Sequence, residues 1–158
     1  MSLAADLLKE TGARGIMLTC AESCTGGMVA AALTDLPGSS AMMERGFVTY
    51  TNRAKIEMLG VKPATLDAVG AVSEEVAREM AQGALDRSGA QIAVAITGIA
   101  GPGGSEHKPE GRVCFAIAAD GVLSAETRDF GALGRDAVRT SARDHALALL
   151  LAAVRNLP

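Results

Sequence analysis

The stretch QIAVAIT, residues 91–97, decides the fold class of this chain. Its centre is an unbroken run of small and β-branched apolar residues, which is typical of a strand buried on both faces. Strands of this kind belong to sheets that carry helices on both sides. A glycine-rich segment, GIAGPGGSEHKPEG at 98–111, follows the strand and predicts a loop at its carboxyl end.

Helical and extended patterns alternate along the rest of the chain. Strands are predicted at 15–21 and 42–50, and a hairpin of 112–119 and 122–130 turns at Asp120-Gly121. Helices are predicted at 3–11 with Gly12 as the stop, at 26–36, at 53–59 behind a Thr51 or Asn52 cap, at 63–70, at 73–87 and at 135–156. The alternation predicts one three-layer α/β/α domain over residues 1–158, with a mixed, mainly parallel sheet.

Composition and charge argue against several classes of protein. Of the 158 residues, 49% are hydrophobic and only 3% aromatic, so the core must be mainly aliphatic. The net charge is −3 and no basic block occurs, which argues against nucleic-acid binding. No apolar stretch reaches the roughly 18 residues of a membrane span, and the N-terminal segment lacks the basic region of a signal peptide. Because three cysteines cannot form a disulfide framework, we expect a cytoplasmic protein with reduced thiols.

A second candidate loop, AESCTGG at 21–27, follows the predicted strand at 15–21. Ligands collect beyond the carboxyl ends of parallel strands, where this loop and the glycine-rich loop would both lie. Three roles are open: Ser23 or Thr25 as a helix cap, Ser23 as a nucleophile, or Cys24 as a nucleophile. N–H groups at the start of the following helix could stabilise an oxyanion, and Gly26 and Gly27 would let a substrate approach the backbone.

A serine nucleophile needs a base, and the chain offers few. His107 lies in the glycine-rich loop and His145 on the last helix among apolar neighbours, and neither has an obvious acid to orient it. Lys55 follows Tyr50 on a short helix and would suit a Ser-Lys arrangement if burial lowers its pKa; an ordinary surface lysine is the alternative. The cysteines and histidines lack the paired spacing of a zinc site, so no metal is predicted.

The glycine-rich loop offers N–H groups that can cradle an anion such as a phosphate. It is not a Walker A loop, because Gly104 stands where the lysine belongs and a predicted strand follows in place of a helix. Its GPGGSE segment also lacks the third glycine of the dinucleotide fingerprint. The segment could contact a ligand or form only a long surface turn, and the sequence does not decide between the two.

Seven stretches taken together resemble one family. AESCTGG, PGSS, GFVTYTNRAK, LGV, GAVSEEVAREMA, AVAITGIAGPGG and KPEGRV occur in the order seen in the C-terminal domain of the competence/damage-inducible protein CinA. The resemblance extends over nearly the whole chain. Single-domain members of that family are nicotinamide-nucleotide amidases. The resemblance therefore implies hydrolysis of the carboxamide of nicotinamide mononucleotide to nicotinate mononucleotide and ammonia, in pyridine nucleotide salvage and without a cofactor.

The resemblance also implies roles for individual residues. Ser23 is the nucleophile, and the segment YTNRAK places Tyr50 and Lys55 beside it. Lys55 would take the serine proton, and Tyr50 would orient the lysine or relay the proton to the leaving ammonia. N–H groups from Cys24 to Gly27 would bind the oxyanion, and the glycine-rich loop at 98–104, with Thr97, would bind the ribose or phosphate. The expected substrate contacts are therefore Thr25, Gly26, Gly27, Thr97, Gly98, Gly101, Gly103 and Gly104.

Two segments depart from the family pattern. KPEGRV makes Glu110 and Arg112 unusual, and substrate preference could differ if that strand lines the site. The start of the last helix, LGRDAVR, has a displaced glycine, and its Arg135 and Arg139 would either meet a phosphate or stay solvated.

An alternative function is a catalytically silent nucleotide-binding or interaction domain linked to competence or the DNA damage response. An amidase for a different small amide is a further option. The expected partner is a small-molecule nucleotide, with no nucleic acid and no membrane. An exposed Met42-Met43 pair and the apolar last helix would leave room for a homo-oligomer.

Overall fold

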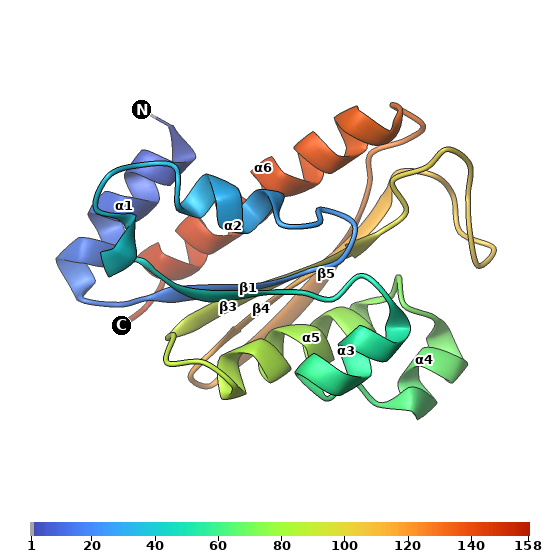
Figure 1. The fold of residues 1–158 in the computed structure, drawn as a ribbon, viewed down its shortest axis with the longest axis horizontal. Helices are drawn as coiled ribbons and strands as arrows, with labels where there is room; N and C mark the ends of the chain where they lie inside the picture. The colour runs from blue at the N-terminus through green and yellow to red at the C-terminus, as the bar shows by residue number, and fades with distance from the viewer. Residues whose placement is uncertain (1) are drawn as a thin grey trace.

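A five-stranded mixed sheet forms the middle of the fold (Figure 1). The computed structural model describes residues 2–158. The strands are β1 (Leu18–Glu22), β2 (Met43–Val48), β3 (Ile92–Gly98), β4 (Arg112–Ala119) and β5 (Val122–Asp129), in the spatial order β2-β1-β3-β4-β5. β1 pairs in parallel with β2 and β3, whereas the β3–β4 and β4–β5 pairs are antiparallel. Only β4 therefore runs against the other strands of the sheet.

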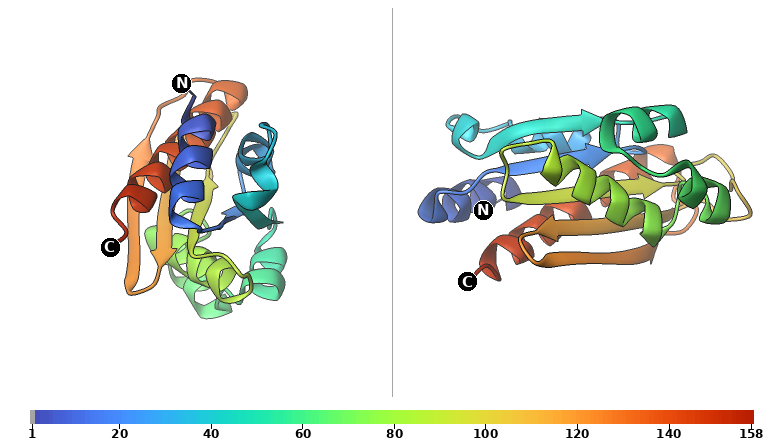
Figure 2. Two further views of the ribbon diagram at one scale, coloured as in Figure 1. Left: turned by 90° about the vertical axis from the view of Figure 1, so that its left-hand side faces the viewer. Right: turned by 90° about the horizontal axis from the view of Figure 1, so that it is seen from below.

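Helices cover both faces of this sheet (Figures 1 and 2). One layer contains α1 (Leu3–Arg14), α2 (Met28–Leu33) and α6 (Arg135–Arg155), and the other contains α3 (Asn52–Leu59), α4 (Pro63–Val69) and α5 (Glu74–Asp86). The predicted three-layer α/β/α architecture is confirmed. No helix in the described part of the chain has the length and apolarity needed to cross a membrane.

The two faces of the sheet carry side chains of different size. On β3, Ile92, Val94 and Ile96 point into the layer of α1, α2 and α6, while Ala93 and Ala95 point toward α5. β4 follows the same division, with Val113, Phe115 and Ile117 on the first face and Cys114, Ala116 and Ala118 on the second. Because side chains alternate along a strand, this pattern gives the sheet one bulky face and one nearly flat face. The flat face lets α5 lie close to the strands.

Two predicted helix boundaries near the N-terminus are wrong. α1 does not stop at Gly12 but continues to Arg14, and Gly15 ends it with a left-handed φ of 63°. α2 covers only Met28–Leu33, where the sequence predicted 26–36. Gly26 and Gly27 have φ values of 57° and 110°, which no right-handed helix allows, so the helix can begin only after them.

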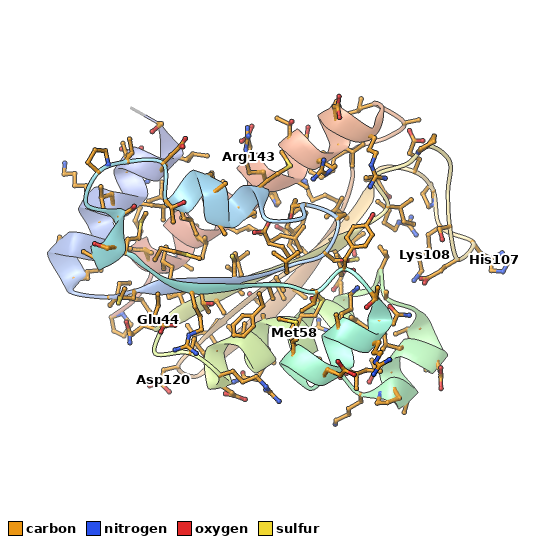
Figure 3. All side chains as sticks on the ribbon, viewed as in Figure 1. Glu44, Met58, His107, Lys108, Asp120 and Arg143 are labelled. Atoms are coloured by element: carbon orange, nitrogen blue, oxygen red, sulfur yellow. The ribbon has the colours of Figure 1, made fainter. Side chains whose placement is uncertain are left out.

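The expectation of an exposed Met42-Met43 pair is also wrong. Met42 is only 1% exposed and belongs to the core beside α1, α2 and α6, while Met43 is partly buried against the same core. Met58, on α3, is a methionine that does reach solvent (Figure 3). A homo-oligomer stays a prediction without support from these two methionines.

α3 lies against α5 at a point where only glycine fits. A Cβ at Gly83 of α5 would fall on the carbonyl oxygen of Leu59, and would stand 2.9 Å from its carbonyl carbon. The obstacle is backbone, so it cannot rotate away. Gly83 therefore sets how closely α3, the helix that carries Lys55, can approach the rest of the fold.

We expect Gly83→Ala to lower the free energy of unfolding by about 1–3 kcal/mol, because overpacking outweighs alanine's better helix propensity. Gly12→Ala is the matched control: Gly12 also lies within a helix, and a Cβ there would meet nothing within 4 Å. This variant should gain roughly 0.5–1 kcal/mol. Urea denaturation of both variants measures the two changes, and equal changes in both would contradict the close-approach argument.

Candidate active site

The loops after β1 and β3 lie side by side because these strands are parallel neighbours. Glu22, the last residue of β1, is in register with Ile96 of β3. The N–H of Ser23 donates to the Ile96 carbonyl at 2.9 Å, which extends the pairing by one more bond. The N–H of Thr49, just past β2, in turn donates to the Glu22 carbonyl at 2.8 Å. Three chain segments therefore converge at the carboxyl edge of the sheet.

The side chains of Ser23 and Lys55 are in contact at this edge of the sheet. The Lys55 Nζ lies 3.1 Å from the Ser23 Oγ and donates to the Tyr50 carbonyl at 3.2 Å. Ser23 is 7% exposed, and Lys55 is 1% exposed. The position of Lys55 follows from the start of α3, where the Thr51 hydroxyl accepts the Ala54 N–H at 3.0 Å and fixes the first turn. The predicted Ser-Lys pair is thus brought together in space.

Burial lowers the pKa of Lys55 from its ordinary value of 10.5, because a desolvated ammonium is unfavourable. The charges of Cys24, when ionised, and of Glu106 oppose this shift in the Lys55 pKa. No carboxylate forms an ion pair with Lys55 within residues 2–158. A buried lysine without such a pair can exist as a neutral amine, the form that accepts a proton.

Burial shifts the pKa of Cys24 in the direction opposite to that of Lys55. Burial raises the pKa of its thiol to about 12, so the thiol stays protonated near neutral pH. A Cβ at Gly98 would stand 3.1 Å from the Cys24 Sγ, 2.7 Å from Val113 Cγ2 and 3.0 Å from the Arg112 carbonyl oxygen, so the thiol lies in a tightly packed place. A protonated, tightly packed thiol is a poor nucleophile. Of the alternatives left open by the sequence, this geometry favours Ser23.

A pocket of about 330 Å³ opens in front of the pair. Most of the sequence-predicted site residues line it: Ser23, Tyr50, Lys55, Thr97, Gly98, Gly101, Gly103, Gly104 and Arg135. Thr25, Gly26 and Gly27 do not line it. Thr97 lines the pocket, but its hydroxyl already donates a hydrogen bond to the Ala71 carbonyl at 2.9 Å.

Of the N–H groups from Cys24 to Gly27 that the sequence offers for an oxyanion, those of Gly26 and Gly27 already have partners. The Gly26 N–H donates to the Ser23 carbonyl at 3.0 Å, and the Gly27 N–H donates to the Glu22 carboxylate at 3.2 Å. The N–H groups of Cys24 and Thr25 have no partner in another residue of the described chain. The donors left for an oxyanion therefore stand one and two residues after Ser23. The Thr25 hydroxyl is buried and likewise has no partner among the described residues.

The backbone carbonyl of Tyr50 contacts Lys55, whereas its side chain lies at the mouth of the pocket. Its ring is 57% exposed, and its hydroxyl contacts Arg135 Nη2 at 3.0 Å. Arg135 also donates from Nη1 to the Gly101 carbonyl at 2.7 Å. The carbonyl of Tyr50, and not its hydroxyl, is thus the group that holds Lys55. Arg135, the first residue of α6, therefore bridges the β2–α3 segment and the glycine-rich loop.

Arg139, the second arginine at the start of α6, holds the loop that carries Ser23. Its Nε donates to the Cys24 carbonyl at 3.0 Å and its Nη2 to the Thr25 carbonyl at 3.4 Å. The sequence suggested that Arg139 either meets a phosphate or stays solvated, whereas in the structure its guanidinium binds backbone carbonyls. Arg139 stabilises the turn after Ser23 from the side of α6.

Neither histidine takes part in this site. His107 lies at the outer tip of the 98–111 loop, directed away from the fold (Figure 3). His145 contacts Glu126 at 2.6 Å and packs edge-on against the Phe115 ring with centroids 4.6 Å apart. The sequence offered no acid partner for His145, and the structure supplies one across the β5–α6 contact. This pair belongs to the packing between sheet and helix.

The family model for the CinA C-terminal domain matches residues 1–154. The chain belongs to the CinA C-terminal domain family. A nicotinamide-nucleotide amidohydrolase PncC from Enterobacter agglomerans is 56% identical over 133 residues, which cover 82% of this chain and 80% of that protein. A crystal structure of the competence/damage inducible protein CihA from Agrobacterium tumefaciens is 48% identical, with a TM-score of 0.93 over 98% of this chain and 94% of that one.

Other members of the CinA family are longer than this chain. A CinA-like protein from Chlorobaculum tepidum is 54% identical over 121 residues, which make up 74% of this chain but 29% of the relative. The chain thus spans about a third or less of the length of the longer curated relatives that it matches.

Sequence reasoning missed the residue that shapes the turn after β1 in this CinA domain. Glu22 is fully buried, and its carboxylate accepts the N–H groups of Gly27, Val29 and Ala30 at 2.9–3.2 Å. It caps α2, a role that the sequence suggested for Ser23 or Thr25. A glutamate that immediately precedes a turn gives no sequence signal of this kind, because capping side chains usually stand at the cap position itself.

Glu22→Gln should lower the free energy of unfolding by about 1–3 kcal/mol, because an amide has one accepting oxygen where the carboxylate uses two. Denaturation in urea measures the change. Glu57→Gln is the control, because this α3 carboxylate is exposed and pairs only with Arg53, and it should change stability by less than about 0.5 kcal/mol. A Glu22→Gln protein as stable as wild type would contradict the capping role.

Proposed function

We propose that this protein hydrolyses the carboxamide of nicotinamide mononucleotide, with Ser23 as nucleophile and Lys55 as its base. The observation that carries the proposal is the 3.1 Å contact between the Ser23 Oγ and a nearly fully buried Lys55 Nζ at the wall of a pocket. A relative named nicotinamide-nucleotide amidohydrolase, 56% identical and covered over 80% of its length, supports the choice of substrate.

The neutral form of Lys55 accepts the Ser23 proton while the Oγ attacks the carboxamide carbon. The lysine, now an ammonium, returns this proton to the amide nitrogen, the carbon–nitrogen bond breaks and ammonia leaves. Ser23 then carries the nicotinoyl group as an ester. A water molecule then gives a proton to Lys55 as its oxygen attacks the ester carbon. The bond between that carbon and the Ser23 Oγ breaks, Lys55 returns the proton to the Oγ, and the nicotinate carboxyl group is released. The scheme uses protein groups and water, and it requires no metal and no cofactor.

The oxyanion formed in each addition step needs N–H donors that are not already engaged. The N–H groups of Cys24 and Thr25 meet this condition among the described residues. The Glu22 and Arg139 contacts hold the turn in which both N–H groups lie. Within the expected set from Cys24 to Gly27, we assign the oxyanion to this pair.

The rest of the substrate would extend from Ser23 toward the glycine-rich loop. Tyr50 and Arg135, joined by their 3.0 Å contact, line the pocket together with Gly101, Gly103 and Gly104. We assign Tyr50 a positioning role through its carbonyl, which holds Lys55 at 3.2 Å. All three cysteines are free and buried, in agreement with a reducing compartment such as the cytoplasm.

Ammonia release from nicotinamide mononucleotide by wild type, Ser23→Ala, Lys55→Met and Cys24→Ala tests the proposal. Ser23→Ala and Lys55→Met should each lose roughly 10³-fold or more in kcat, and Cys24→Ala should stay within about tenfold of wild type. Lys55→Met should be no less stable than wild type, because it removes a buried ionisable group of similar length. The loss of activity could then not be attributed to unfolding.

A wild-type protein that binds the nucleotide but releases no ammonia would be a binding or interaction domain, the alternative function, and would overturn the proposal. A Cys24→Ala variant as inactive as Ser23→Ala would move the nucleophile to the thiol. Release of ammonia from another small amide, but not from the mononucleotide, would keep the chemistry and change the substrate.

The pH dependence of kcat/KM tests the role of Lys55 separately. Because only the neutral amine accepts the serine proton, kcat/KM should rise with pH by about tenfold per unit until Lys55 is deprotonated, and then level off. Burial lowers the Lys55 pKa, so this plateau should begin below pH 10.5. A rate that falls as pH rises through this range would mean that the ammonium is the active form, which contradicts the base role.

A further inference from the structure

The tip of the 98–111 loop is a two-residue turn made by Glu106 and His107. The N–H of Ser105 donates to the Lys108 carbonyl at 3.0 Å, and the N–H of Lys108 donates back to the Ser105 carbonyl at 2.8 Å. Glu106 and His107 both have a left-handed backbone conformation, with φ values of 52° and 62°. Asparagine and glycine are the usual residues of such a turn, because other side chains are disfavoured there. Contacts outside the turn must therefore hold it.

Lys108 fixes this turn against the segment between α4 and α5. Its Nζ donates to the carbonyls of Val69 and Val72 at 2.7 and 2.6 Å. The Glu106 carboxylate comes to the same place, because a Cβ at Gly70 would overlap its Oε2. Val72 and Glu106 both line the pocket in front of the Ser-Lys pair. The turn thus brings a carboxylate to the pocket wall.

Glu106 is the only carboxylate residue among the described residues that line the pocket. Its nearest cation, Lys108, stands 3.8 Å away and outside the pocket lining, with two of its N–H groups on backbone carbonyls. The charge of Glu106 acts on the centre of the pocket, because it opposes the lowering of the Lys55 pKa. A cationic group bound in front of Ser23 would therefore be attracted to this carboxylate.

Nicotinamide mononucleotide has such a group. Its pyridine nitrogen carries the ribose, so the ring is a pyridinium cation, and only one ring carbon separates this nitrogen from the carbon that bears the carboxamide. With the carboxamide at Ser23, the positive ring lies within the pocket. Free nicotinamide and dihydropyridine forms of the ring are neutral and gain nothing from a nearby carboxylate.

We propose that Glu106 is a specificity-determining residue: its carboxylate at the pocket wall favours ligands whose carboxamide is carried by a cationic pyridinium ring over ligands whose ring is neutral. The inference rests on the proposed function, because that function puts the carboxamide at Ser23. It adds that the site recognises the charge of the ring as well as the amide.

Calorimetric binding of nicotinamide mononucleotide and of its reduced, dihydropyridine form tests the inference without turnover. The two ligands share the phosphate, the ribose and the carboxamide, and only the oxidised form has a charged ring. On a Ser23→Ala background, Glu106→Gln should weaken binding of the oxidised form about three- to tenfold, as expected for loss of an opposite charge a few ångströms away near the surface. Binding of the reduced form should change by less than about twofold.

Glu110→Gln on the same Ser23→Ala background is the matched control. Glu110 is a carboxylate of the same loop, but it does not line the pocket, and its Oε1 accepts the Gly103 N–H at 2.5 Å, a contact that the glutamine oxygen can keep. This variant should change the preference for the oxidised form by less than about twofold. An equal loss of preference in both variants would show a general effect of loop charge and would overturn the inference.

Glu106→Asp separates the charge from the shape of the turn. Aspartate keeps a carboxylate and tolerates the left-handed conformation, so this variant should retain more of the preference than Glu106→Gln does. A preference as low as in Glu106→Gln, or equal losses for both ligands, would mean that Glu106 only shapes the loop, which contradicts the inference. An unchanged preference in Glu106→Gln, a gain for the oxidised form, or a Ser23→Ala parent that binds neither ligand would overturn it as well. Failure of the amidase function is seen independently, as absence of ammonia release by wild type.

Discussion

A fully buried carboxylate and a guanidinium hold the turn that carries Ser23 from its two sides. Glu22 takes N–H groups at the start of α2, and Arg139 takes the carbonyls of Cys24 and Thr25 from α6. A buried charge is tolerated only where hydrogen bonds replace its water, and here backbone groups of α2 and of the turn before it do so. The turn cannot relax without leaving one of these charges unsatisfied. The remaining N–H groups of the turn therefore point in fixed directions.

The position of Lys55 depends on a different set of contacts. α3 is short, and it is held by its Thr51 cap and by the close approach to Gly83 of α5. The flat, alanine-rich face of the sheet lets α5 come near, and α3 lies on α5. Burying an amine in this way costs stability, which packing elsewhere in the domain must offset. The free energy that this burial costs falls at the residue that we propose as the base.

The sequence was sufficient for the architecture and insufficient for much of the site. The apolar run at 91–97 and the Asp120-Gly121 turn predicted a layered mixed sheet, because those patterns act locally. The residue types made Lys55 one candidate base for Ser23, but its placement beside Ser23 came from a family resemblance, since the two residues are 32 positions apart. The capping role of Glu22 and the direction of the Tyr50 side chain depend on which segments meet at the sheet edge. Single-chain patterns do not contain that information.

The glycine-rich loop joins β3 to β4, and these two strands pair with each other up to Gly98 and Val113. Both ends of the loop are therefore clamped by the same ladder, while its middle forms one wall of the pocket. Substitutions in the middle can reshape the wall at little risk to the sheet, because no core strand has to move. Ser23 and Lys55, in contrast, stand on segments whose contacts are shared with the core. The segment 101–106 is therefore the natural place to vary the pocket wall when a new ligand preference is to be selected in the laboratory, because Ser23 and Lys55 need not move.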